Sequence, residues 1–136
     1  MRIAIPVWED KVSPVFDAAS KLLVIDYEDG RETSRLAYHI DEEDLSWKCQ
    51  RIESLAPDII ICGAVSHLFL NLLKAVDIDV IEYVSGRIED VLEAYIRGDI
   101  YNSRFLMPGC KRHGRVCGGR KKTGRQKKNE INREDI

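Results

Sequence analysis

The chain has 136 residues, of which 44% are hydrophobic and 32% charged, enough for one domain with its own core. The longest uncharged run, residues 59–73, is too short to cross a bilayer, and the composition excludes a membrane protein or a disordered acidic chain. Residues 1–110 carry 11 basic and 20 acidic side chains, a balance of −9, whereas residues 111–136 carry 10 basic and 3 acidic, a balance of +7.

The charge asymmetry predicts an acidic folded domain over residues 1–109 and a basic tail over residues 110–136. The basic stretch contains no Phe, Tyr or Trp and has four glycines, so it cannot bury enough apolar surface to offset the entropy of ordering. We therefore expect the tail to be disordered. The N-terminal residues show neither an apolar export core nor a cleavage site, so a cytoplasmic protein is expected.

Three strands are predicted at the start of the chain. Residues 2–7 form a short apolar run, and Pro14 is expected to keep residues 12–17 out of regular structure. Residues 22–28 and 32–38 flank Asp29 and Gly30, a pair that suits a type I′ turn because both central residues need a positive φ. The second and third strands are therefore expected to be antiparallel neighbours.

A first helix is expected after Asp41, which can cap it while the acidic residues that follow fill its first turn. Pro57 ends this helix, and residues 58–62 form a continuous apolar run that is typical of a strand covered on both faces. The apolar positions of the helix recur at helical spacing: Leu45, Cys49, Ile52 and Leu55.

Two further helices flank a short strand at residues 79–83. The helix that follows Gly63 and Ser66 has its apolar face at Phe69, Leu72, Leu73 and Val76. The last helix opens at Ser85 and Gly86, ends at Gly98, and has a predicted buried stripe of Ile88, Val91, Leu92, Tyr95 and Ile96. The order β-β-β-α-β-α-β-α predicts an α/β fold with a mixed sheet whose first, fourth and fifth strands are parallel and central.

Ligands of open α/β sheets bind beyond the carboxyl ends of the parallel strands. Three loops leave those ends here, at residues 8–17, 63–67 and 84–87, and we refer to them together as the rim. Its candidate binding residues are Asp10, Ser13, Asp17, Cys62, Ser66, His67, Ser85 and Gly86.

Several segments resemble the dinitrogenase iron–molybdenum cofactor biosynthesis family. They are Met-Arg-Ile-Ala-Ile-Pro-Val-Trp-Glu at residues 1–9, Val-Ser-Pro-Val-Phe-Asp-Ala-Ala at 12–19, Leu-Val-Ile-Asp at 23–26, Cys-Gly-Ala-Val-Ser at 62–66, Val-Ser-Gly at 84–86, Glu-Asp-Val-Leu-Glu-Ala-Tyr at 89–95 and Phe-Leu-Met-Pro-Gly at 105–109. The resemblance covers residues 1–109 and implies a ribonuclease-H-like three-layer α/β/α fold with a mixed five-stranded sheet. It also implies a protein that binds or carries iron–sulfur precursors of the nitrogenase cofactor.

Cys62 and His67 are candidate iron ligands, because thiolate and imidazole both suit iron and iron–sulfur chemistry. The alternative left open is that His67 faces solvent at the start of a helix and that Cys62 is a core thiol. Cys49, on an apolar helix face, is predicted to belong to the core.

Enzymatic activity is not expected. A ribonuclease-type nuclease needs an acidic residue in the first strand, where this chain has none. A hydrolase is not favoured, because there is no Gly-x-Ser-x-Gly elbow and because His39 and His113 are expected far from the rim. Asp17 is expected to order its own turn. Ser66 and Ser85 are expected to cap helices, whose free N–H groups favour an anionic ligand.

The sequence thus favours a non-enzymatic carrier of an iron–sulfur or iron–molybdenum cofactor precursor, with cluster donor or acceptor proteins as partners. The alternative is an interaction or nucleic-acid-binding protein acting through its basic tail. Nucleic acid is the weaker partner, because the tail has no aromatic residue for stacking and the acidic domain would repel phosphates.

The tail also contains Cys110, His113 and Cys117, spaced closely enough to converge on one Zn or Fe ion. Three ligands are fewer than the four usual for structural zinc, so a free tail with two thiols is the favoured interpretation.

Overall fold

The computed structural model describes residues 1–41, 43–100 and 105–107. The chain divides into two units, Met1–Ile100 and Tyr101–Ile136, and the fold and site below belong to the first. The predicted boundary between residues 109 and 110, and with it the predicted tail, lies outside the described residues.

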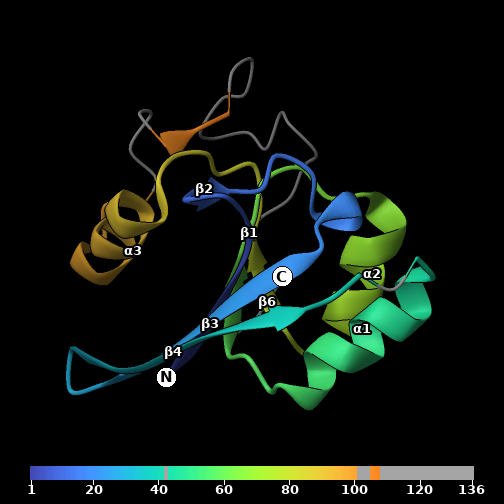
Figure 1. Ribbon diagram of the computed structural model, residues 1–136, viewed down its shortest axis with the longest axis horizontal. Coiled ribbons are helices and arrows are strands. Elements are labelled where there is room, and N and C mark those ends of the chain that lie inside the picture. Colours follow the sequence, from blue (N-terminus) through green and yellow to red (C-terminus); the bar gives the residue numbers. More distant parts are fainter. Residues whose placement is uncertain (42, 101–104, 108–136) are drawn as a thin grey trace. The chain divides into compact units, whose positions relative to one another are not determined.

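A mixed β-sheet forms the centre of the first unit (Figure 1). Its strands are β1 (Arg2–Trp8), β3 (Lys21–Glu28), β4 (Arg31–His39), β5 (Ile59–Ile61) and β6 (Asp79–Ile81), in the order β4-β3-β1-β5-β6. Strand β1 is antiparallel to β3 and parallel to β5, and β5 is parallel to β6. The predicted mixed α/β topology is confirmed, with two corrections: β6 lies at the edge of the sheet and is not central, and a sixth strand, β2 (Lys11–Val12), pairs with β1 beside the five predicted strands.

Two tight hairpins shape the N-terminal half of the sheet. Asp29 and Gly30 join β3 to β4 with φ values of 54° and 77°, as the predicted turn requires. A second hairpin, at Glu9 (φ 59°), returns the chain into the short strand β2 (Lys11–Val12), which pairs with the end of β1. Residues 12–17 are more regular than expected, because they include the end of β2 and the start of a 3₁₀ helix, η1 (Phe16–Ala18).

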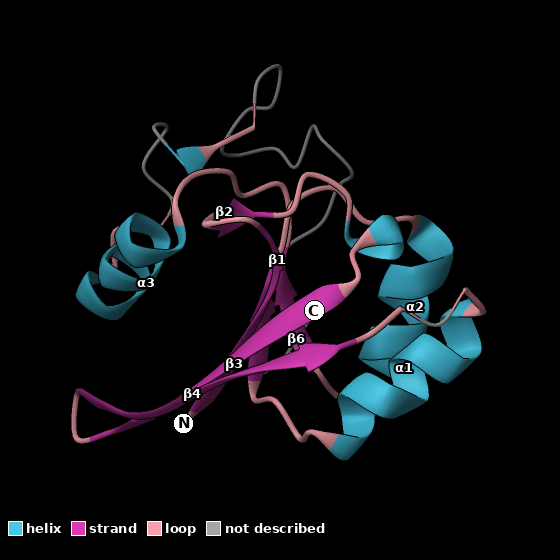
Figure 2. Ribbon diagram, viewed as in Figure 1, coloured by secondary structure: helices cyan, strands magenta, loops and turns pink. Residues whose placement is uncertain are grey.

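Three helices cover the two faces of the sheet, α1 (Leu45–Ser54), α2 (His67–Ala75) and α3 (Ile88–Arg97). Figure 2 shows α1 and α2 on one side of the sheet and α3 on the other. The core between the sheet and the first two helices contains Ala4, Leu22, Val24 and Ile60 from the strands and Cys49, Ile52, Phe69 and Leu73 from the helices. The alternate residues Ile3, Ile5 and Ile61 are also buried, as expected for strands covered on both faces. These three layers match the predicted architecture.

The helix ends correct two details of the prediction. Asp44, not Asp41, caps α1, because its carboxylate accepts from the amides of Ser46 and Trp47, and no acidic residue occupies the first turn. The N-cap position of α3 is Arg87, two residues after Ser85, so Ser85 does not cap this helix. Ile96 was predicted to be buried, but it is 43% exposed. Gly98 ends α3 at a φ of 82°, as predicted.

Candidate functional site

The three loops of the rim are joined directly to one another at the carboxyl ends of β1, β5 and β6 (upper part of Figure 1). The first and second loops form a parallel bridge between Val15 and Ala64. In it the Phe16 amide donates to the Ala64 carbonyl at 2.8 Å, and the Ala64 amide donates to the Pro14 carbonyl at 2.8 Å. Gly63 is required beside this bridge, because a Cβ there would lie 2.6 Å from the Ser13 carbonyl oxygen.

The third loop is bonded to both of the others. The Val12 amide donates to the Gly86 carbonyl at 3.0 Å, and the Ile88 amide donates to the Asp10 carbonyl at 2.9 Å. The Tyr83 amide, one residue before the third loop, donates to the Gly63 carbonyl of the second loop at 2.9 Å and so holds these two loops together. Backbone hydrogen bonds thus hold the rim as one unit, and the predicted convergence of the three loops is observed.

Asp17 and Ser66 connect the first loop to the start of α2. One carboxylate oxygen of Asp17 accepts from the Ser66 amide at 2.9 Å, and the other accepts from the Ser66 hydroxyl at 2.5 Å. The Ser66 hydroxyl oxygen in turn accepts from the Phe69 amide at 3.1 Å, so Ser66 caps α2 as predicted. The expectation that Asp17 orders its own turn is wrong: its carboxylate binds a residue 49 positions away.

The other predicted rim residues differ in how far they are available to a ligand. Ser13 is buried, and its hydroxyl donates to the Val15 carbonyl at 3.3 Å. Asp10 is exposed and lies 3.5 Å from the guanidinium of Arg87. Ser85 and Gly86 are half-buried, and Gly86 adopts a φ of 132°, a conformation that favours glycine.

The two candidate metal ligands of the described residues lie in different environments. Cys62 has no exposed surface and belongs to the core, and burial, with a smaller contribution from Glu82 and Asp17, raises the pKa of its thiol well above the usual value. Because no part of this side chain reaches the surface, the structure favours the core interpretation of Cys62. His67 is exposed as the first residue of α2, directly after Ser66.

Among residues 1–41, 43–100 and 105–107, no three His, Cys, Asp or Glu side chains are grouped closely enough to hold a metal ion. Cys110, His113 and Cys117 lie outside this part of the chain. His67 is therefore the one predicted metal ligand that the described part of the chain shows at the surface of the rim.

His39 lies closer to the rim than expected. Strands β1 and β4 are both antiparallel to β3. The pairs Pro6–Leu22 and Lys21–His39 therefore put the carboxyl ends of β1 and β4 at the same end of the sheet. His39 is therefore an exposed histidine at the same end as His67, but it is separated from β1 by β3.

Sequence reasoning missed Lys48. This lysine is 2% exposed, and its ammonium donates to the carbonyls of Asp17 and Ala19 at 2.8 and 2.9 Å. A signal was present, because Lys48 lies three residues after Leu45 and four before Ile52, on the apolar face of α1. The partners come from a distant segment and could not be read from α1 alone.

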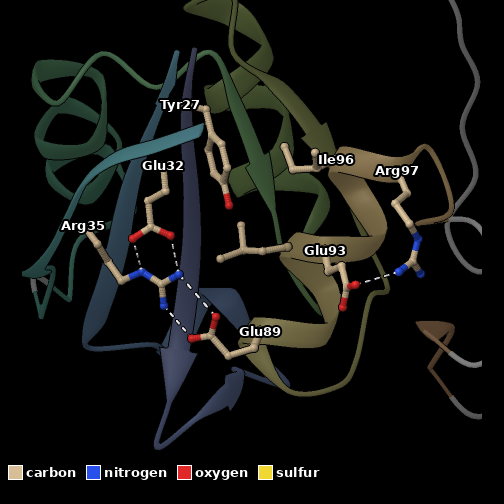
Figure 3. A pocket seen from close by; sticks show the side chains of 8 residues that line it. Tyr27, Glu32, Arg35, Glu89, Glu93, Ile96 and Arg97 are labelled. Carbon is tan, nitrogen blue, oxygen red and sulfur yellow. Dashed lines mark hydrogen bonds and ion pairs between the residues drawn. The ribbon is translucent and has the colours of Figure 1, made fainter. Parts of the chain in front are cut away.

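An open hollow of about 360 Å³ lies away from the rim, between α3 and the β3–β4 hairpin (Figure 3). Its central arginine, Arg35, binds Glu32 at 2.7 Å and Glu89 at 2.6 Å. Hydrogen bonds from Arg35 lower the pKa of Glu89. Arg97, the other arginine of the hollow, is paired with Glu93 and Asp99. Because each guanidinium is already paired with two carboxylates, neither offers a free positive charge to an anion.

None of the helices in the described part of the chain is long and apolar enough to cross a membrane. No curated protein matches the sequence significantly. The solved structures similar to this chain include that of PH0822, which is 23% identical with a TM-score of 0.67 over 72% of this chain and 92% of the other. The protein MJ0327 from Methanocaldococcus jannaschii is 19% identical, with a TM-score of 0.62 over 73% of this chain and 90% of its own.

The apo form of the orange protein from Desulfovibrio gigas is also similar, at 17% identity and a TM-score of 0.61, over 72% of this chain and 88% of its own. These identities are low, so the likeness concerns the fold. The family model described as "Dinitrogenase iron-molybdenum cofactor" matches residues 1–98, which include the whole rim and every strand and helix named above. The chain therefore belongs to the dinitrogenase iron–molybdenum cofactor family.

Proposed function

We propose that the protein binds and carries an iron–sulfur or iron–molybdenum cofactor precursor at the rim, without catalysing a reaction. The observation that carries this proposal is the junction of the three loops into one unit, with the His67 imidazole exposed beside it. Family membership supports the class of cargo. Similarity to a protein solved in an apo form is consistent with a carrier.

The chemistry of the rim favours attachment through His67. An exposed imidazole can ligate iron at a vacant position of a cluster that brings its own sulfides. Cys62 is not needed for this attachment, because its side chain has no exposed surface.

The hydroxyl and carboxylate groups of the rim support a binding role more than a catalytic one. The groups of Ser13, Asp17 and Ser66 bind one another or nearby backbone, so they stabilise the loops. The Ser66 hydroxyl lies beside the Asp17 carboxylate, but the carboxylate also accepts from the Ser66 amide and the hydroxyl also accepts from the Phe69 amide, so both groups are engaged in holding the start of α2. We accordingly propose that cluster donor and acceptor proteins are the partners and that the protein acts in the cytoplasm.

Anaerobic reconstitution tests this function. The full chain is titrated with a cluster donor, desalted, and analysed for iron, sulfide, molybdenum and visible absorbance. We expect wild type to take up a stoichiometric amount and His67→Ala to lose most of it, whereas the matched control His39→Ala retains it. No stoichiometric uptake by wild type, or equal uptake by His67→Ala, would overturn the proposal.

A further inference from the structure

Lys48 is a charged residue in the core of the acidic domain. A lysine that is only 2% exposed has lost most of the water around its ammonium, which is unfavourable unless other groups replace that water. Two carbonyl oxygens do so, those of Asp17 at 2.8 Å and Ala19 at 2.9 Å. An apolar side chain would fill the same place without this desolvation, so packing alone does not account for the ammonium.

The two carbonyls belong to the segment that leads from the first loop of the rim, through η1, into β3. Asp17 binds Lys48 through its carbonyl and Ser66 through its carboxylate, so one residue connects α1, η1 and α2. Ser66 caps α2, and His67 is the next residue. Lys48 is therefore connected to His67 by two hydrogen bonds, from Lys48 to Asp17 at 2.8 Å and from Ser66 to Asp17 at 2.9 Å, and then by the peptide bond between residues 66 and 67.

We infer that Lys48 is a positioning residue for cluster binding. Its ammonium fixes the segment of Asp17 and Ala19, the Asp17 carboxylate fixes Ser66, and Ser66 fixes the place of the His67 imidazole. This role rests on the proposed function of His67, which it deepens. Lys48, on α1, should fix the first residues of α2 in the protein without cargo as well.

The test replaces the ammonium and keeps the length of the side chain, in Lys48→Met. Lys21→Met is the matched control, because Lys21 is an exposed lysine two residues after Ala19 and loses the same charge. In the cargo-free protein we expect Lys48→Met to speed hydrogen exchange of the Ser66 amide about tenfold or more, the effect of losing charged hydrogen bonds. Nuclear magnetic resonance spectra of the same samples should show shifted signals of the His67 imidazole ring. Lys21→Met should change neither the exchange of the Ser66 amide nor the His67 signals.

Cluster affinity provides the second measurement. We expect Lys48→Met to weaken uptake about tenfold per folded molecule, whereas Lys21→Met binds like wild type. Asp17→Asn should weaken uptake too, and the double variant should lose less than the two single losses combined, because both act through Ser66. If Lys48→Met does not fold, Lys48→Arg takes its place, since it keeps the charge but moves the donors.

The inference is overturned if Lys48→Met lowers the free energy of unfolding while the Ser66 amide, the His67 ring signals and uptake per folded molecule stay as in wild type. It is equally overturned if the Lys48 and Asp17 effects on uptake are additive. Failure of wild type to bind any cluster would instead refute the proposed function. The exchange and ring-signal measurements would still decide whether Lys48 controls the start of α2.

Discussion

Replacing Gly63 by alanine should separate the first two loops of the rim. A Cβ at residue 63 would lie 2.6 Å from the Ser13 carbonyl oxygen and 2.7 Å from that of Pro14, against an ordinary contact of 3.4 Å or more. Both neighbours are backbone atoms, which cannot rotate away as the end of a side chain could. Relief therefore requires the loops to move apart by about 0.8 Å, the difference between 3.4 and 2.6 Å.

This displacement would lengthen the two 2.8 Å hydrogen bonds that join Ala64 to Pro14 and Phe16 to about 3.6 Å, which is too long for a hydrogen bond. Each bond contributes about 0.5–1.5 kcal/mol, and the remaining overpacking adds a similar amount, so we expect Gly63→Ala to lower the free energy of unfolding by about 2–4 kcal/mol. Urea unfolding measures this loss, and hydrogen exchange of the Phe16 and Ala64 amides measures the local opening.

Gly98→Ala is the control for this prediction. Gly98 has a φ of 82°, and a Cβ added there would meet no atom within 4 Å, so alanine at this position introduces backbone strain without a clash. The strain of a non-glycine residue in the left-handed region costs about 1–2 kcal/mol. Its effects should stay at the end of α3. If Gly63→Ala is no more destabilising than Gly98→Ala, and the rim amides exchange as in wild type, the reasoning about close approach is refuted.

Three further predictions concern single groups. Ser66→Ala should lower the free energy of unfolding by about 1 kcal/mol through loss of the cap, and it should leave Asp17 bound only to the backbone amide of residue 66. Urea unfolding and amide exchange measure these effects, and unchanged stability would contradict them. Burial raises the pKa of Cys62, so the free energy of unfolding should fall as the pH rises above about 9, where the thiol of the unfolded chain ionises. Cys62→Ala should make this fall with pH less steep, and an equally steep fall in the variant would count against the reasoning. Hydrogen bonding to Arg2 lowers the pKa of Asp26, so Asp26→Asn should be less stable than wild type at neutral pH. The difference should shrink as the pH falls below about 4, where an ordinary carboxyl becomes protonated, and a difference independent of pH would exclude this cause.

Local sequence signals predicted the features that depend on neighbouring residues. Asp29 and Gly30 identified the β3–β4 hairpin because a two-residue turn with positive φ accepts few residue types. Ser66 was identified as a cap because it directly precedes an apolar helical pattern. The apolar run at residues 58–62 identified a covered strand in the same way.

Features that depend on distant contacts could not be predicted. Asp41 and Asp44 are equally good caps by residue type, and only the backbone geometry selects Asp44. Asp17 binds Ser66 across 49 residues, and Lys48 binds Asp17 across 31, distances at which no pattern in one sequence indicates a pair. The three loops that make up the rim were thus predictable from topology, whereas the hydrogen bonds that fix the geometry of the rim were not.

The most direct test of the central claim is pulsed electron paramagnetic resonance of the cluster-loaded full chain, prepared with ¹⁵N-labelled histidine and reduced to a paramagnetic state. We expect one ¹⁵N coupling of the size typical of a nitrogen bound to the cluster. It should be present in wild type and in His39→Ala and absent in any cluster that His67→Ala retains. A loaded wild-type protein without such a coupling, or the same coupling in His67→Ala, would contradict attachment of the cargo through His67.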